Sequence, residues 1–297
     1  MNRLCFQFAA VLAACLIFSS LAISTRADLL FHDSFDYGPV GSDLLGKNGG
    51  LGSSNPWQFG GFNANLHNNF KVGANSLPFG NLVTSGNHVT TSSTNQLSGV
   101  TRILDASTGI TGPGNTFYFS LLVTPKGTLN QGVFNGFFGL TLSGANNSEL
   151  FLGKPGGGAI NDYVIEDRGG TQQRSSNIRA VVDQTTLLVL KMEIGQANMN
   201  DRFTLFVNPT PGGLEPGIGN AIKSDLSLGR VNALTFYSSG AFQADELRIG
   251  RTYASVTAVP EPSSLCLCSM LLVGLYGVAK RSRKCNVATL NRSSKSI

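Results

Sequence analysis

The chain has 297 residues, a formal net charge of +5 and 13% charged residues. Eight of its 22 Lys and Arg lie outside residues 28–259, and this central region carries 14 Lys and Arg against 16 Asp and Glu, a net charge of −2. A near-neutral region without a basic cluster excludes nucleic acid as its partner.

All five cysteines lie in the two ends of the chain, at positions 5, 15, 266, 268 and 285. Residues 28–259 therefore contain no disulfide, no cysteine nucleophile and no zinc site with Cys ligands. A region of about 230 residues can bury enough apolar surface to fold without such cross-links.

The N-terminus has the three parts of a secretory signal. Arg3 is followed by an apolar stretch at 4–23 and then by Thr25-Arg26-Ala27, which offers small residues at the −3 and −1 positions of a cleavage site. We predict a signal peptide over 1–27. The alternatives are an uncleaved N-terminal anchor and a lipoprotein box ending at Cys15.

Residues 28–252 show short apolar runs separated by Gly, Pro and Asn, which is typical of an all-β domain. Around ten strands of this kind predict one sandwich of two antiparallel sheets. Gly41–Asn69 is predicted to be a long loop that carries Trp57, the only tryptophan. The predicted runs are 29–35, 116–123, 133–142, 149–152, 163–165, 187–194, 202–207, 233–237 and 245–249.

Alternation within these runs predicts strands that are buried on one face. Phe203, Leu205 and Val207 fall on one face of their run, and Met192 and Ile194 share a face in another. We place a linker at 253–264, where the strand pattern ends and proline appears.

An uncharged stretch at 265–279 follows this linker and precedes four cations. At about 1.5 Å per residue it spans roughly 22 Å, which is short for a hydrocarbon core of about 30 Å. The basic residues after it favour a transmembrane anchor with a cytoplasmic tail at 280–297, rather than a buried core helix. The four cations of this membrane stop are Lys280, Arg281, Arg283 and Lys284.

The motif before the apolar stretch completes a pattern that resembles the PEP-CTERM sorting signal of exopolysaccharide-producing bacteria. The motif consists of Val259, Pro260, Glu261 and Pro262. The resemblance implies export, transient anchoring in the membrane and cleavage near Pro-Glu-Pro by an exosortase. One departure is the tail at 285–297, which is longer than is usual in that family.

A second resemblance covers most of 28–252. Asp33-Ser34-Phe35-Asp36-Tyr37, Asn48-Gly49-Gly50 with Trp57, the segment 189–209, and Asp245–Gly250 are similar to concanavalin A-like, laminin-G-like jelly rolls. The resemblance implies a two-sheet jelly roll, and the apolar stretches at the two ends of the chain predict a signal helix and a transmembrane helix that flank it. Proteins of this fold include lectins, glycosidases and adhesion modules, so it leaves the ligand open.

Catalytic constellations are not found. A glycosidase needs two carboxyl groups that flank one bond, but Glu166-Asp167 and Asp245-Glu246 are adjacent pairs. Neighbouring strand residues point to opposite faces, so the two carboxyl groups of each pair should lie on opposite faces of the sheet. For Asp245-Glu246 we expect a structural role, in which one side chain accepts hydrogen bonds from turn amides and the other faces solvent. We predict no catalytic residue.

Metal ligands are also sparse. His32 is expected on a strand surface, and His67 and His88 in solvated loops, so a histidine metal site is not predicted. Calcium is the better candidate cofactor, because Asn161-Asp162 and Asn198–Asp201 are rich in oxygen atoms. The same residues are ordinary turn formers, and we therefore assign no metal ligand and no cofactor.

Aromatic residues among Asn and Gly suggest a sugar-binding surface. The alternative is that these rings close one end of the sandwich core. The candidates are Tyr37, Trp57, Phe59 and Phe62.

The sequence as a whole favours an exported, membrane-anchored, non-enzymatic protein of the cell surface or exopolysaccharide matrix, with polysaccharide as a ligand. One alternative is a carbohydrate-active enzyme, a glycosidase or lyase, whose acids converge only in the folded domain. The other is a purely structural matrix component. Two carboxyl groups in a groove would favour the enzyme, and a domain without an aromatic-lined groove would favour the structural role.

Overall fold

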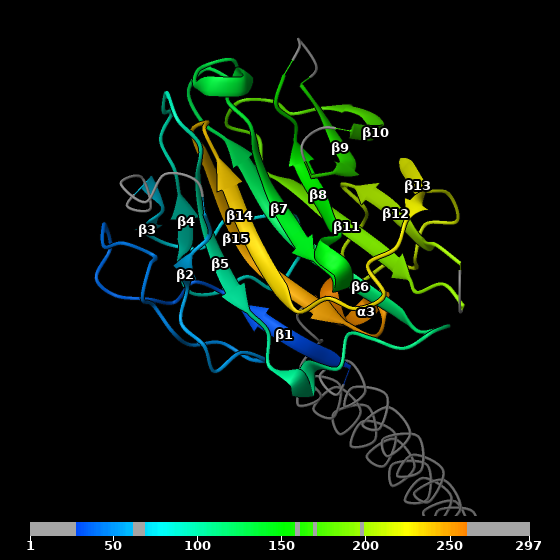
Figure 1. Ribbon diagram of the computed structural model, residues 1–297. Coiled ribbons are helices and arrows are strands. Elements are labelled where there is room, and N and C mark those ends of the chain that lie inside the picture. Colours follow the sequence, from blue (N-terminus) through cyan, green and yellow to red (C-terminus); the bar gives the residue numbers. More distant parts are fainter. Residues whose placement is uncertain (1–27, 62–68, 158–160, 169–170, 197–198, 260–297) are drawn as a thin grey trace, which may run out of the picture. The chain divides into compact units, whose positions relative to one another are not determined.

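The computed structural model describes residues 28–61, 69–157, 161–168, 171–196 and 199–259 (Figure 1). The predicted signal peptide, membrane anchor and basic tail lie outside these ranges. No helix inside them is long and apolar enough to cross a membrane.

Strands and turns make up nearly all of the described chain, with four short helices between them. The strands are β1 (Leu29–Asp33), β2 (Gln58–Phe59), β3 (Lys71–Gly73), β4 (His88–Thr90), β5 (Ser98–Ile103), β6 (Thr116–Pro125), β7 (Phe138–Ser143), β8 (Glu149–Lys154), β9 (Asp162–Asp167), β10 (Thr171–Arg179), β11 (Thr186–Glu193), β12 (Asp201–Val207), β13 (Ala221–Leu226), β14 (Ala233–Ser238) and β15 (Phe242–Gly250). The helices are η2 (Ala106–Thr108), η3 (Val133–Asn135), η4 (Ala145–Asn147) and α3 (Tyr253–Val256).

These strands form two antiparallel sheets, which confirms the predicted β-sandwich (Figure 1). The eight-stranded sheet has the order β13-β12-β11-β6-β15-β4-β3, and β1 pairs with β15. The seven-stranded sheet has the order β10-β9-β8-β7-β14-β5-β2. Every strand pair among the described residues is antiparallel. Strands far apart in the sequence, such as β5 and β14, are neighbours in the sheet.

The main core lies between the sheets and follows the alternation read from the sequence. Phe203, Leu205 and Val207 on β12 point into it together, as do Met192 and Ile194 on and after β11. Such strands are stabilised mainly by apolar area removed from water, at about 25 cal/mol per Å².

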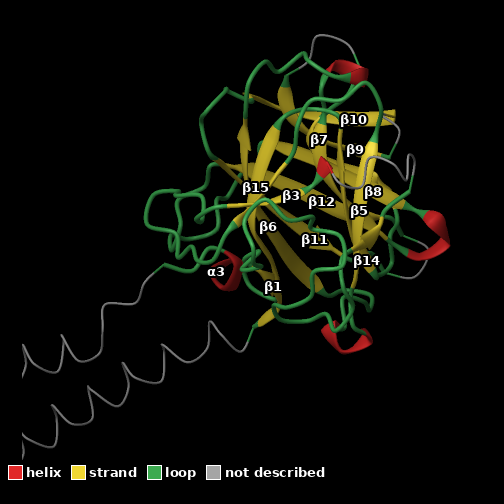
Figure 2. Cartoon of the chain, turned by 90° about the vertical axis from the view of Figure 1, so that its left-hand side faces the viewer, coloured by secondary structure: helices red, strands yellow, loops and turns green. Residues whose placement is uncertain are grey.

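The outer face of the eight-stranded sheet is covered by other parts of the same chain. Leu122 and Val189 on this face pack in a second apolar cluster with Leu77 of a loop and Val256 of α3. Figure 2 shows α3 beside β6, and Ser120 on β6 donates a hydrogen bond to the carbonyl of Val256. These contacts cover the part of this face around β6.

Residues 253–259, which the sequence assigned to the linker, are packed on the domain instead. The carbonyls of Thr257 and Ala258 accept hydrogen bonds from Gly212 N at 2.9 Å and Val83 N at 3.0 Å. Val256 is fully buried in the cluster on the outer face of the eight-stranded sheet. The compact unit therefore runs to Val259, because burying the apolar side chains of α3 outweighs leaving this segment free.

Candidate functional site

The four aromatic residues predicted to bind glycan are not brought together. Trp57 is 1% exposed and Tyr37 7% exposed, and both belong to the main core. Phe59 on β2 is 42% exposed, and Phe62 lies outside the described residues. For Trp57 and Tyr37 the core position is the correct interpretation.

A buried carboxyl group explains why these two rings turn inward. Asp33 Oδ2 accepts hydrogen bonds from the Tyr37 hydroxyl at 2.7 Å and from Trp57 Nε1 at 3.0 Å. The Trp57 ring stacks on Phe236, with centroids 5.5 Å apart. Asp33 thus satisfies the polar atoms that would otherwise keep these rings at the surface.

A different set of aromatic rings lines a hollow of about 450 Å³ on the outer face of the seven-stranded sheet. This size falls in the usual range of small-molecule sites. Phe134 is 58% exposed at its rim, and the ring centroids of Phe134 and Phe137 are 6.5 Å apart. The residues that line this aromatic pocket are Leu97, Phe134, Phe137, Thr141, Phe151, Gly156, Gly157, Glu166, Arg168 and Tyr237.

Strand register places these side chains side by side. Thr141 on β7 is opposite Phe151 on β8, and Phe151 is in turn opposite Glu166 on β9. Residues directly opposite in antiparallel strands project to the same face of the sheet. One row of the sheet therefore presents a hydroxyl, a ring and a carboxyl group to the same pocket.

Two glycines allow the rings to lie flat against the sheet. A Cβ at Gly139 would overlap the ring of Phe151, and a Cβ at Gly99 would come within 2.6 Å of the Tyr237 ring. Glycine inside a strand weakens it, so its use here has to be explained by the close approach of another group. Here the approaching groups are the aromatic rings of the pocket.

Glu166 is the acidic group of the pocket. It is 4% exposed and accepts a hydrogen bond from Gln173 Nε2 at 2.6 Å. Burial raises the pKa of its carboxyl group, although the Gln173 hydrogen bond opposes this. A carboxyl group of this kind binds a proton more readily than one at the surface.

Arg168 is the basic group, and its charge is compensated by Glu149. Its Nη1 lies 2.5 Å from Glu149 Oε2, and its guanidinium carbon lies 5.0 Å from the centre of the Tyr237 ring. The salt bridge and the cation–π contact hold the guanidinium at the pocket wall.

The hydroxyl group of Thr141 is the third polar feature. Thr141 is fully buried with respect to solvent, yet its Oγ1 has no hydrogen-bond partner among the described residues. A buried hydroxyl without a partner is destabilising by about 1–3 kcal/mol. A ligand in the pocket could supply the missing partner.

The first predicted acid pair splits across the sheet as expected. Glu166 faces the pocket, whereas Asp167 lies 3.0 Å from Lys223 Nζ of β13, in the other sheet. The second acid near the pocket is Glu149, which precedes Phe151 by two residues and so shares the face of Glu166. Such diagonal neighbours lie roughly 7–8 Å apart.

The second predicted pair does not split. Asp245 accepts hydrogen bonds from Leu77 N at 2.8 Å and Ser76 Oγ at 2.5 Å, as predicted for a structural acid. Glu246, however, is 1% exposed rather than facing solvent, and it accepts hydrogen bonds from Ser85 N and from Arg248. The cause is a β-bulge between Asp245 and Arg248, with Glu246 at φ +51°, which breaks the alternation.

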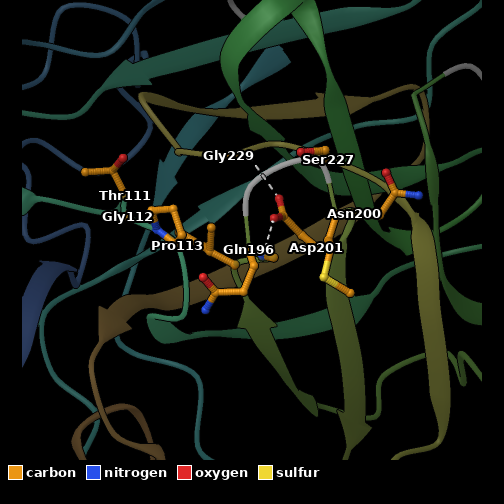
Figure 3. Close-up of a pocket in the computed structure, with 11 residues that line it drawn as sticks. Thr111, Gly112, Pro113, Gln196, Asn200, Asp201, Ser227 and Gly229 are labelled. Atoms are coloured by element: carbon orange, nitrogen blue, oxygen red, sulfur yellow. Dashed lines mark hydrogen bonds between the residues drawn. The ribbon is translucent and has the colours of Figure 1, made fainter.

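A second hollow, of about 420 Å³, includes part of the oxygen-rich segment considered for calcium (Figure 3). The carboxylate of Asp201 faces backbone amides there. It accepts hydrogen bonds from Gly195 N at 2.9 Å, Leu228 N at 2.7 Å and Gly229 N at 2.9 Å. Its two oxygens are thus used by loop amides. Within the described part of the chain, no three or more His, Cys, Asp or Glu side chains are grouped as metal ligands.

The histidines take structural positions where they are described. His32 Nε2 lies 2.7 Å from Glu246 Oε2, and His88 is 7% exposed on β4, with Nδ1 2.8 Å from the Asn75 carbonyl. The solvated loop predicted for His88 is therefore wrong, because β4 pairs with β15 and covers this side chain. His67 lies outside the described residues.

No protein-family model and no curated protein matches the chain. Among solved structures, an endo-1,3-beta-glucanase from Streptomyces sioyaensis is 10% identical, with a TM-score of 0.41, over 74% of this chain and 94% of that chain. The catalytic domain of a GH131 beta-glucanase from Podospora anserina is 14% identical, with a TM-score of 0.42, over 75% and 90% of the two chains. The carbohydrate recognition domain of Emp46p is 8% identical, with a TM-score of 0.36, over 62% and 88%. At these values we draw neither activity nor ligand from the similarities.

Proposed function

We propose that this protein is a non-enzymatic glycan-binding protein and that the aromatic pocket on the seven-stranded sheet is its binding site. The observation that carries the proposal is the combination in one hollow of aromatic rings with Glu166, Arg168 and the unpartnered hydroxyl of Thr141. Apolar surface with a few placed polar groups is what small polar ligands require.

Each part of the pocket has a role in this proposal. The exposed ring of Phe134 offers an apolar face against which the C–H face of a sugar can pack. Glu166 accepts hydrogen bonds from sugar hydroxyls, Arg168 donates to them, and Thr141 can do either. The aromatic-lined hollow favours this function over that of a structural component without a ligand.

Export and anchoring are part of the same proposal. The signal peptide at 1–27, the motif at 259–262 and the apolar stretch with its four cations support display outside the cell, with an exosortase as processing partner. A concanavalin A-like jelly roll, flanked by a signal helix and a transmembrane helix, would then be tethered at the cell envelope or released into the exopolysaccharide matrix.

A glycosidase remains the second candidate, because one observation favours it. Glu166 has a raised pKa, as a general acid needs, and Glu149 shares its face on the neighbouring strand. A second carboxylate must also be open to water or to the sugar. Glu149 is instead held by Arg168 at 2.5 Å, which supports binding over hydrolysis.

The test is glycan-array screening of residues 28–259, followed by calorimetry with the best oligosaccharide. Phe134→Ala should weaken binding about tenfold, because it removes an exposed ring of the pocket. Phe59→Ala is the matched control, since Phe59 is exposed outside the pocket and should leave affinity unchanged. Equal losses in both variants, or no glycan bound, would contradict the proposal, and release of reducing sugar from the bound glycan would favour the glycosidase.

A further inference from the structure

Glu166 is a buried acid that faces a hollow, and no cation among the described residues contacts it there. Within the described residues no Lys, Arg or His forms an ion pair with it. Its hydrogen bond is with the neutral amide of Gln173. Buried charges in proteins are normally paired or coordinate a metal, so the missing partner requires an explanation.

Other buried acids of the domain have their oxygens saturated, by cations or, at Asp33, Asp201 and Asp245, by several N–H and O–H donors of the chain. Glu246 is 1% exposed and contacts both Arg248 at 2.7 Å and His32 at 2.7 Å. Lys223 is fully buried and contacts Asp167 at 3.0 Å and Asp225 at 2.5 Å. The cation that lines the pocket, Arg168, is paired with Glu149.

The walls around Glu166 favour a positive charge. Phe134, Phe137, Phe151 and Tyr237 line the same hollow, with the ring centroids of Phe137 and Phe151 6.2 Å apart. The face of an aromatic ring carries negative electrostatic potential and attracts a cation within about 6 Å. Because Glu149 neutralises Arg168, Glu166 gives the pocket a negative charge when it is ionised.

We propose that the site is specific for a glycan with free amino groups, whose ammonium group binds the Glu166 carboxylate among the aromatic rings. This inference rests on the proposed glycan binding and names the chemical class of the ligand. Glu166 would then gain in the complex the cationic partner that it lacks in the free domain. Acetylation would remove the charge of the amine and add bulk, so N-acetylated sugar should bind less well.

Burial of the carboxyl group supports the same ligand. In the free domain burial raises the pKa of Glu166, which means that its charged form is poorly stabilised there. An arriving cation within about 4–6 Å favours the charged form. An ion pair in a partly buried pocket is also screened less by salt than one at the surface.

The experiment compares three tetrasaccharides of one linkage: β-1,4-linked glucosamine, its N-acetylated form and the corresponding glucose tetramer. Affinities of residues 28–259 are measured by calorimetry at about pH 6, below the pKa of an alkylamine. We expect the glucosamine tetramer to bind at least about tenfold more tightly than the other two. In Glu166→Gln that preference should disappear, while Glu193→Gln, which changes a carboxylate on β11 of the other sheet, should keep it.

Each remaining outcome separates this inference from the proposed function. Equal affinity for all three sugars, lost in Phe134→Ala, would refute the amino-sugar inference and leave glycan binding in place. A preference for glucosamine that survives in Glu166→Gln would refute the assignment to this pocket. Binding of none of the three, with an empty glycan array, would overturn the proposed function and the inference together.

Discussion

The outer faces of the two sheets differ in how far other segments of the chain cover them. On the eight-stranded sheet, the loop that contains Leu77 and the short helix α3 pack over the strands and form a second apolar cluster. On the seven-stranded sheet, the rings of Phe151 and Tyr237 lie against glycine positions and border an open hollow. An apolar patch on a sheet face is thus either covered by the chain itself or left beside a hollow.

The buried acids differ in the same way. Asp245 and Glu246, on the covered side, are saturated by loop amides and by Arg248, so they hold the cover in place. Arg248 also donates a hydrogen bond to the carbonyl of Val83 in that cover. Glu166 is nearly as buried but faces a cavity. Burial of an acid therefore indicates a binding role only where its partners are incomplete and space remains beside it.

The largest expected effect is on the covered face. Although burial opposes it, the hydrogen bond from His32 and the charge of Arg248 lower the pKa of Glu246. Arg248→Met would leave this carboxylate buried without its main cation, and the free energy of unfolding should fall by roughly 3–5 kcal/mol. Urea denaturation of residues 28–259 measures it. Arg174→Met, which breaks an ion pair with side chains 45% and 34% exposed, should cost at most about 1 kcal/mol. Similar losses in both would show that the covering loop does not depend on Glu246.

An intermediate effect is expected on the open face. Gly139→Ala places a methyl group against the ring of Phe151, and the overlap should cost about 1–3 kcal/mol of stability and displace the ring from the pocket. Glycan affinity should fall with it. Gly217→Ala is the control, because a Cβ at that position meets no atom within 4 Å. If Gly139→Ala were as stable as Gly217→Ala and bound glycan as tightly, glycine at 139 would not be needed to accommodate the Phe151 ring.

The smallest effect should separate binding from folding. Thr141→Val keeps the shape of the side chain and removes a buried hydroxyl without a partner, so stability should be unchanged or higher by about 1 kcal/mol. Glycan affinity should fall about fivefold, because one hydrogen bond is worth about 1 kcal/mol. Thr235→Val should instead lower stability and leave glycan affinity unchanged, because its hydroxyl lies 2.8 Å from that of Thr101 and outside the pocket. Thermal unfolding and calorimetry on both variants decide the point, and loss of stability in Thr141→Val would show that its hydroxyl has a partner within the fold.

The strands that the sequence predicted all contribute to the core, although the unpredicted strands β3, β4 and β5 also contribute Val72, Val89 and Val100. All nine predicted runs overlap a strand, because their Phe, Leu, Val and Ile side chains record a buried face, but in the run 133–142 the strand begins only at Phe138, after η3. The strands that were not predicted have few apolar residues, as in β10 (TQQRSSNIR) and β13 (AIKSDL), which lie at sheet edges. Main-chain hydrogen bonds to a neighbouring strand make these segments extended, and those bonds leave no mark in the pattern.

The candidate site was harder to predict than the fold. Phe137 and Phe151 stood inside or beside predicted strands, but nothing local distinguishes an outward ring beside a cavity from one in the core. The rings chosen from sequence, Trp57 and Tyr37, turn inward because Asp33, distant by 24 and 4 residues, accepts their polar hydrogens. Likewise, strict alternation predicted that Glu246 faces solvent, but the β-bulge after Asp245 turns its side chain inward and buries it.

The sequence by itself determined the all-β class, the two-sheet sandwich, the absence of cysteine from residues 28–259 and the opposite directions of Glu166 and Asp167. These are consequences of composition and of the two-residue period of a strand, which are local properties. Only the tertiary structure decided that β7, β8, β9 and β14 are neighbours, that 253–259 belongs to the domain, and that the chain covers the outer face around β6 but leaves the aromatic pocket open. The physical reason is that strand order and loop packing depend on contacts between residues far apart in the chain, whose energies no single segment contains.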